Sequence, residues 1–315
     1  MSINLIMGVD NIDKLHKIHN MNINQIFCGY IDSYAKKKWT EELCIVNKRG
    51  SNCNIVGKKN FKKFAEQCKK QKISMHVTFN TLYTPEQYKW VLNAIDYVSK
   101  FEQVKGIIVS DIGLLLRLKN IGYKKDIVIS NGASVFNSSA VSFYKQFNVN
   151  RIILNRQTKS DEIIKILKKH KDMNFEIFLL LGNCMFADGF CSLFHKTGIN
   201  NYGIANCGLI YNAYNENNYN ILKTNKKNII KKDLNNYRSI GCNLCLIKKL
   251  KKYSNRITYK LVTRSNYLNE FDRIEKLLPI IKNLDTNNYD IKNLFFKLFN
   301  KKCDGYGCYI SDKIV

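Results

Sequence analysis

The stretch "GIIVSDIGLLLRLKNIGYKKDIVIS", residues 106–130, contains two short apolar runs separated by a longer amphipathic one. The runs 106–110 and 126–130 are continuously apolar, as strands must be when both of their faces are covered. The segment between them, 112–119, has a helical pattern. A strand, a helix and a second strand in this order indicate an α/β fold.

The same alternation occurs along most of the chain. The further expected strands are "NLIMGV" (4–9), "QIFCGY" (25–30), "SMHVTF" (74–79), "RIILN" (151–155), "FEIFLLL" (175–181) and "ITYKLV" (257–262). The other helical patterns cover 10–19, 57–71, 85–103, 137–147, 160–171 and 268–283. Eight strands separated mostly by helices predict a (β/α)8 TIM-like barrel, regular or irregular. An open doubly wound sheet is the alternative, but no glycine-rich dinucleotide fingerprint follows the first strand.

Residues 182–256 differ from the rest, because they are rich in Asn, Tyr and Lys and have few regular patterns. They form a long cysteine-bearing insertion before the last strand, within a barrel domain expected over 1–290. Long loops of this kind are usually functional or disordered, and the cysteines favour function. A short basic helix and "CDGYGCYI" (303–310) make up a separate C-terminal tail, 291–315.

A barrel places its active site at the C-terminal ends of the strands. That rule selects a set of polar residues before any motif is considered: Asp10, Asn80, Asp111, Asn131, Arg156, Asn183 with Cys184, and Arg264. Asp111 has a second interpretation as a helix N-cap. Asn80 and Asn137 also have two interpretations, as substrate contacts or as caps and turns. No catalytic residue is assigned.

The first residues, "MSINLIMGVD", are not expected to act as a secretory signal, so the eleven cysteines are expected to be thiols or metal ligands in a reducing cytoplasm. Four of them are interpreted as small packing residues: Cys28, Cys44, Cys53 and Cys68. Seven others fall in or after the insertion: Cys184, Cys191, Cys207, Cys242, Cys245, Cys303 and Cys308. Their spacing is compatible with an iron–sulfur cluster, with zinc or with no metal. A catalytic thiol assisted by His195 is a weaker alternative.

The formal net charge is +26, which favours nucleic-acid contact. The lysines are nevertheless spread along the chain, so a solvated basic surface and an AT-rich coding bias explain the charge equally well. No apolar run is long enough to span a membrane, and we expect a cytoplasmic protein. Four insertion tyrosines are candidates for stacking on RNA bases or for packing: Tyr202, Tyr211, Tyr214 and Tyr219.

Five segments, in order, resemble those of the peptidase U32 family, whose members were labelled collagenase-like proteases. They are "HVTFNTLYTPEQY" (76–88), "GIIVSDIGLLLRL" (106–118), "ISNGASVFNSSAVSFYKQFNVNRIILNR" (129–156), "EIFLLLGNCMFADGFC" (176–191) and "GCNLCLIKKL" (241–250) followed by "YKLVTR" (259–264). The resemblance implies a barrel and a [4Fe–4S] cluster held by Cys184, Cys191, Cys207 and Cys245. Cys242 is the alternative fourth ligand. No role is assigned to Cys303 or Cys308.

The resemblance also implies an oxygen-independent hydroxylase that acts on a tRNA or rRNA base or on a small aromatic substrate, with prephenate as the hydroxyl donor. Arg156 and Arg264 are suited to a dicarboxylate, because a guanidinium binds carboxylates bidentately. Two departures weaken the transfer of an acid–base role: Gln157 stands where the family commonly has Glu, and "KLVTR" (260–264) lacks an acid and a glycine. The alternatives are a peptidase and a non-enzymatic cluster-binding subunit, for instance in a heterodimer with a related U32 protein.

Overall fold

The computed structural model describes residues 3–39, 53–182, 184, 187–190, 241–264, 268–284, 287, 289–303 and 308–309. In this part of the chain eight parallel strands close into a barrel: β1 (Asn4–Gly8), β2 (Gln25–Ile31), β4 (Ser74–Phe79), β5 (Val104–Val109), β6 (Asp126–Ile129), β7 (Arg151–Ile153), β8 (Asn174–Leu180) and β9 (Ile257–Leu261). The barrel closes because β1 pairs with both β2 and β9. The predicted (β/α)8 barrel is therefore confirmed, and the open sheet is excluded.

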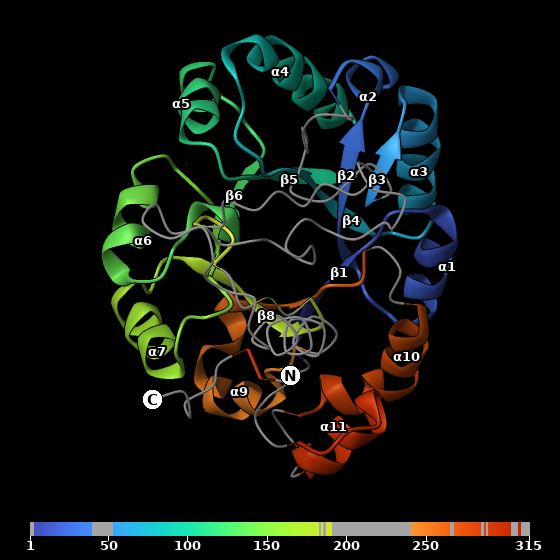
Figure 1. Ribbon diagram of the computed structural model, residues 1–315, viewed down its shortest axis with the longest axis vertical. Helices are drawn as coiled ribbons and strands as arrows, with labels where there is room; N and C mark the ends of the chain where they lie inside the picture. The colour runs from blue at the N-terminus through green and yellow to red at the C-terminus, as the bar shows by residue number, and fades with distance from the viewer. Residues whose placement is uncertain are drawn as a thin grey trace, which may run out of the picture.

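Helices surround the strands, as the view down the barrel shows (Figure 1). Those that the sequence predicted are α1 (Ile12–Asn20), α3 (Lys58–Lys70), α4 (Pro85–Ser99), α5 (Ile112–Asn120), α6 (Ser138–Lys145), α7 (Ser160–Lys169) and α10 (Leu268–Lys282). Each buries an apolar stripe against the barrel. In α3 the buried residues Phe61, Phe64, Ala65 and Cys68 follow the spacing of one helical face.

Several short elements were not predicted: α2 (Ser33–Trp39), β3 (Asn54–Val56), η2 (Asn131–Ala133), α9 (Leu244–Lys249) and η4 (Lys251–Arg256). The strand β3 pairs with residues 29–31 of β2, beyond the point where β1 pairs with residues 26–27. It therefore widens the sheet at the C-terminal end of β2. Its apolar residues are only Ile55 and Val56, too few to indicate a strand, which is why the sequence does not reveal it.

The end of the insertion is attached to the barrel beside β8. The Leu181 N–H donates to the Gly241 carbonyl at 2.8 Å, and the Asn243 N–H donates to the Leu179 carbonyl at 2.8 Å. The elements α9 and η4 then lead to β9, so residues 244–256 are helical rather than irregular as expected.

The C-terminal tail begins with the predicted basic helix, α11 (Ile291–Phe299), whose buried face includes Leu294 and Leu298. Arg273 of α10 donates to the Leu298 carbonyl at 3.1 Å, which fastens α11 to α10. Further along, the Tyr309 N–H donates to the Cys242 carbonyl at 3.2 Å. The tail therefore returns to the insertion end beside β8.

The core contains three of the cysteines interpreted as packing residues. Cys28 and Cys68 are 0% exposed and Cys53 is 6% exposed, in agreement with that interpretation. Cys44 lies outside the described residues. No helix among the described residues is long and apolar enough to cross a membrane.

Candidate active site at the barrel mouth

Polar side chains follow most of the barrel strands at the point where each strand ends, and together they line the mouth. They are Asn80 after β4, Ser110 after β5, Ser130 and Asn131 after β6, Asn155 and Arg156 after β7, and Arg264 after β9. All of these except Asn80 are buried. The carboxyl ends of barrel strands form the face on which barrel enzymes build their active sites.

A buried ion pair holds the segment that follows β8. The Nη2 of Arg156 donates to Oδ2 of Asp188 at 2.6 Å, and the two side chains are 6% and 9% exposed. The other guanidinium nitrogen, Nη1, donates to the Gly182 carbonyl, and the group lies 4.5 Å from the Phe178 ring centre. Burial by itself lowers the pKa of Arg156, but Asp188 brings it above its usual value, so the guanidinium stays charged.

Cys184 is half-buried beside this pair. Its backbone carbonyl accepts a hydrogen bond of 2.7 Å from Nε2 of Gln157, which directly follows Arg156. The turn into this segment requires Gly182, whose φ is +71° and where a Cβ would lie 2.7 Å from Cγ1 of Val262. Two neighbouring residues after β7 thus fix the position of the first predicted cluster ligand.

A chain of hydrogen bonds crosses the mouth from β5 to β6. Ser110 Oγ donates to the Asn80 carbonyl at 3.2 Å, and Asn80 Nδ2 donates to Ser130 Oγ at 3.2 Å. Ser130 in turn donates to Oδ1 of Asn131 at 3.3 Å, and Asn131 Nδ2 donates to Asp188. The chain therefore ends on the same carboxylate that Arg156 binds.

Two amide atoms at the mouth are buried without a hydrogen-bond partner among the described residues: Oδ1 of Asn80 and Nδ2 of Asn155. Burying an unsatisfied polar atom is costly, so native structures keep few of them without a reason. At the catalytic end of a barrel, the simplest reason is that a bound molecule supplies the missing partner.

Arg264 lies on the other side of the mouth, inside the barrel. Its Nη1 donates to Oγ1 of Thr78 at 3.3 Å, and its guanidinium carbon lies 5.0 Å from the Phe27 ring centre. Gly8 makes room for it, because a Cβ there would lie 2.8 Å from Cγ of Arg264. Nearby, Asp10 forms a buried pair with Lys14 at 2.9 Å.

The remaining two candidates cap helices. Asp111 accepts from the Leu114 N–H at 2.6 Å as the N-cap of α5, which confirms that interpretation. It also accepts from the Tyr88 hydroxyl at 2.8 Å and from the Tyr83 N–H at 3.0 Å, so both of its oxygens are engaged by the protein. Asn137 is exposed and caps α6 by accepting from the Ala140 N–H at 3.0 Å.

The cysteines predicted to hold a cluster are only partly within the described structure. Cys242 is buried opposite Leu180, and Cys245 is exposed in the first turn of α9. Cys191, Cys207, His195 and the four insertion tyrosines lie outside the described residues. Among the residues that are described, no three His, Cys, Asp or Glu side chains are gathered closely enough to ligate an ion.

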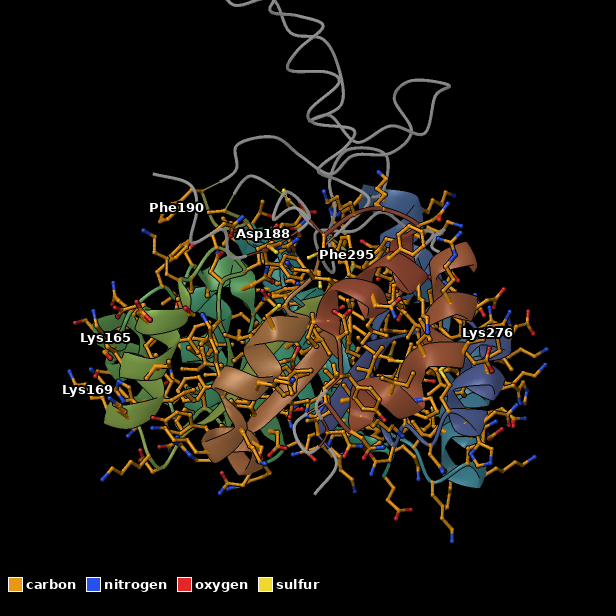
Figure 2. All side chains as sticks on the ribbon, turned by 90° about the horizontal axis from the view of Figure 1, so that it is seen from below. Lys165, Lys169, Asp188, Phe190, Lys276 and Phe295 are labelled. Carbon is orange, nitrogen blue, oxygen red and sulfur yellow. The ribbon has the colours of Figure 1, made fainter. Side chains whose placement is uncertain are left out.

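An aromatic pair stands at the rim of the mouth. Phe190 is 76% exposed, and its ring is nearly parallel to that of Phe136, at an interplanar angle of 7° and a centroid distance of 6.1 Å. Figure 2 shows Phe190 and Asp188 at the same end of the barrel, while Lys165 and Lys169 of α7 lie on its flank. Asp188, Phe190 and Gln157 were not predicted as site residues, although the first two lie within the segment 176–191 and Gln157 directly follows the segment 129–156.

The sequence profile of Peptidase family U32 matches residues 10–284, which is most of the chain. The chain belongs to this family. Within the U32 family, two curated relatives named tRNA hydroxylation protein P are similar to it over 87 residues: that of Haemophilus influenzae is 36% identical and that of Escherichia coli is 33% identical. The match covers 28% of this chain and only 19% of the length of each relative.

One solved U32 structure resembles the fold. The structure described as the U32 peptidase Mk0906 aligns with 84% of this chain and 93% of its own, at 10% sequence identity and a TM-score of 0.46.

Proposed function

We propose that this U32 protein modifies tRNA by hydroxylating a base without molecular oxygen, with a [4Fe–4S] cluster as its cofactor. The observation that carries the proposal is the position of Cys184, which Gln157 holds at the barrel mouth beside the buried Arg156–Asp188 pair. The names of the two relatives support tRNA as the substrate class. An rRNA base and a small aromatic molecule remain the alternative substrates.

The residues at the mouth fit a cluster. Cys184 is half-buried, and Arg156 places positive charge close to it. Positive charge favours a thiolate, which is the form that binds iron. Cys191 and Cys207 would supply two more thiolates, and the fourth would come from residues 242–245, with Cys245 expected and Cys242 as the alternative. When bound, the cluster would supply electron-transfer chemistry.

The proposed hydroxyl donor is prephenate, a dicarboxylate. Arg156 is already paired with Asp188, and Arg264, which lies inside the barrel beside Thr78, is a second guanidinium suited to binding a donor carboxylate. The unpartnered amide atoms of Asn80 and Asn155 would orient the donor or the base by hydrogen bonds. These residues bind and orient; no proton-transfer role is assigned to them.

The rim of the mouth supports an RNA substrate. An exposed aromatic ring such as Phe190 offers a face on which an unpaired base stacks, and the formal net charge of +26 attracts the phosphate backbone. A cytoplasmic location follows from this substrate class and is part of the proposal.

The other functions considered have less support. A peptidase needs an activated nucleophile, and the buried His76 has no hydrogen-bond partner at either ring nitrogen among the described residues. A cluster-binding subunit that works in a heterodimer with a related U32 protein would need no substrate contacts. The unpartnered amides at the mouth therefore favour an enzyme over such a subunit.

The deciding experiment compares nucleosides of tRNA and rRNA from cells with and without the gene by mass spectrometry. A hydroxylated tRNA nucleoside should disappear with the gene and return with the wild-type chain. It should not return with Cys184→Ser, whereas Cys53→Ala, a change at a buried packing cysteine, should restore it.

Anaerobically purified protein should be brown and contain about four irons per chain. Unchanged tRNA nucleosides in the deletion strain would refute the proposal that tRNA is the substrate. Colourless, iron-free protein that still restores the nucleoside would refute the proposal that an iron–sulfur cluster is the cofactor.

A further inference from the structure

Exposed lysines gather on α2 and on the first two turns of α3, beside the barrel mouth. In α3 they recur at positions i, i+1, i+4 and i+5, on the face opposite to the buried Phe61 and Phe64. The α2–α3 basic surface consists of seven exposed lysines: Lys36, Lys37, Lys38, Lys58, Lys59, Lys62 and Lys63.

The two helices begin side by side at the mouth end of the barrel. The helix α2 follows the C-terminal end of β2, and β3, which precedes α3, pairs with residues 29–31 at that same end. The Gly57 N–H donates to the Ile31 carbonyl at 2.8 Å, and a Cβ at Gly57 would lie 3.5 Å from Oγ of Ser33. Figure 1 shows α2 and α3 as neighbours on one side of the barrel and α7 on the opposite side.

Few carboxylates balance the α2–α3 basic surface. Lys38 pairs with Glu86 of α4, and Glu66 is the one acid in α3, which carries six lysines. Asp32 is turned inward, because it accepts from Nε1 of Trp90 at 2.9 Å and from the backbone before α2 ends. Within the described part of the chain, four of the lysines form no ion pair: Lys37, Lys59, Lys62 and Lys63.

This arrangement lowers the stability of the free chain. Lys58 with Lys62, and Lys59 with Lys63, are like-charge pairs at i, i+4, which destabilise a helix. The first turn of α3 contains no acid, although the helix macrodipole favours negative charge there and disfavours lysine.

The lysines of α7, on the opposite flank, are by contrast accompanied by carboxylates. The first turn of α7 contains Asp161 and Glu162, and Glu162 pairs with Lys165 at 3.5 Å. A coding bias would add lysines to both helices, but it would not remove carboxylates from only one of them. Unbalanced positive charge beside the mouth is instead what a polyanionic partner requires.

An exposed aromatic ring stands among these lysines. Tyr34 of α2 is 60% exposed, and its ring packs edge-on against Trp39 at a centroid distance of 5.8 Å. Nζ of Lys38 lies 5.9 Å from the Tyr34 ring centre. Exposed rings beside cations are typical of surfaces that bind single-stranded nucleic acid, because bases stack on the ring while the cations contact phosphate.

We propose that the α2–α3 basic surface binds the phosphate backbone of tRNA next to the base that enters the mouth, and that an unpaired neighbouring base stacks on Tyr34. This inference rests on the proposed function, because it takes tRNA as the substrate. Phe190 stacks on Phe136, which lies just before α6, and Figure 1 places α6 across the barrel from α3. A bound tRNA would therefore span the mouth between the two aromatic rings.

The test compares tRNA binding by two triple variants that lose the same charge. The first combines Lys59→Gln, Lys62→Gln and Lys63→Gln, and the control combines Lys165→Gln, Lys168→Gln and Lys169→Gln of α7, where all three lysines are exposed. At about 0.1 M salt, the affinity of the purified chain for tRNA should fall about tenfold or more in the first and less than about threefold in the control. The slope of log affinity against log salt concentration should become shallower by about 3 in the first variant.

The variant Tyr34→Ser separates stacking from charge. It should weaken tRNA binding about fivefold or more and leave the salt slope unchanged, because it removes a ring and no cation. An affinity equal to that of the wild type would remove Tyr34 from the proposal.

Equal losses in the two triple variants, or wild-type affinity in the first, would overturn the α2–α3 basic surface. So would binding of the wild-type chain to vesicles of phosphatidylserine and phosphatidylcholine without binding to tRNA. A second measurement needs no variant: bound tRNA should protect Lys37, Lys59, Lys62 and Lys63 from acetylation, as mapped by mass spectrometry. Protection of the three α7 lysines instead would also overturn the surface.

Failure of this inference and failure of the proposed function give different results. If the modified nucleoside depends on the gene but the first triple variant binds tRNA as the wild type does, only the α2–α3 basic surface is wrong. If that surface binds tRNA but the nucleosides of the deletion strain are unchanged, only the modification is wrong.

Discussion

The interior of the barrel and its mouth both bury polar side chains, but only the interior neutralises its charges within the strands themselves. Glu176 of β8 pairs with Lys260 of β9 and, at 3.5 Å, with Arg151 of β7. Arg151 also donates to Gln25 of β2, on the opposite wall, at 3.4 Å. This interior network ties four strands together across the barrel. The buried His76 is an exception: its Nε2 lies 3.9 Å from Oδ2 of Asp126, and neither ring nitrogen has a hydrogen-bond partner in the described part of the chain.

At the mouth, by contrast, the buried ion pair holds a loop, and some amide atoms make no hydrogen bond among the described residues. Arg156 and Asp188 fix the segment after β8, while Oδ1 of Asn80 and Nδ2 of Asn155 have no partner among the described residues. In the interior network the charged groups satisfy one another, whereas the mouth keeps open amide atoms at the face where barrel enzymes bind their substrates. Leaving polar atoms buried and unsatisfied is costly, so the open amides at this face are the arrangement expected for ligand contacts.

The largest expected effect comes from removing the interior cation. Lys260→Met should lower the free energy of unfolding by about 3–5 kcal/mol, because it leaves Glu176 buried without its closest partner. The matched control Lys165→Met removes a lysine whose side chain is 72% exposed and should cost less than about 1 kcal/mol. Urea unfolding measures both. Equal losses in the two variants would show that the interior network does not stabilise the barrel.

An intermediate effect is expected in acid. Burial by itself raises the pKa of Glu176, but Lys260 and Arg151 bring it below its ordinary value of 4.5. The stabilisation is therefore complete above pH 4.5 and is lost as the pH falls through the lower, folded-state value. Urea unfolding at a series of acidic pH values should show a steep loss of stability in the wild type. A shallower loss is expected in Glu176→Gln, and parallel curves would contradict the assignment.

The smallest effect on stability is expected at the mouth. Asn155→Ala removes an Nδ2 that has no partner among the described residues and one long contact, in which Oδ1 accepts from the Gln157 N–H at 3.3 Å, so the free energy of unfolding should fall by only about 1 kcal/mol. If Asn155 contacts substrate, the amount of modified nucleoside should nevertheless fall by about tenfold or more. A stability loss as large as that of Lys260→Met would place Asn155 with the interior network instead.

Most of the fold could be predicted from the sequence. The eight barrel strands lie in apolar runs that stand out from the helices between them, and even the three-residue β7 belongs to the longer run 151–155. Among the elements that escaped prediction, β3 has only two apolar residues, Ile55 and Val56, and α2 buries only Ala35 and Trp39, so neither has a clear apolar pattern. The helix α9 escaped because it has six residues at the end of a polar insertion, so its buried Leu244 and Ile247 span too little sequence to show a helical pattern.

The candidate site was predicted in part. The rule that strand ends carry function selected Asn80, Asn131, Arg156 and Arg264, and the structure does place these side chains around one mouth. The same rule selected Asp111, which the structure uses as a helix cap. Asp188 was not selected because it follows its strand by eight residues. Its role depends on the turn at Gly182, which brings it back over Arg156.

By itself the sequence determined the barrel, its family and the residues at its strand ends, because strand and helix periodicity and segment order are properties of neighbouring residues. Only the tertiary structure decided which of those residues meet. It joined Gln157 to Cys184 and Asp188 to Arg156, and it brought Cys308 beside Cys242. Such pairings depend on how loops return to the sheet, and a local pattern holds no record of a partner that lies tens of residues away.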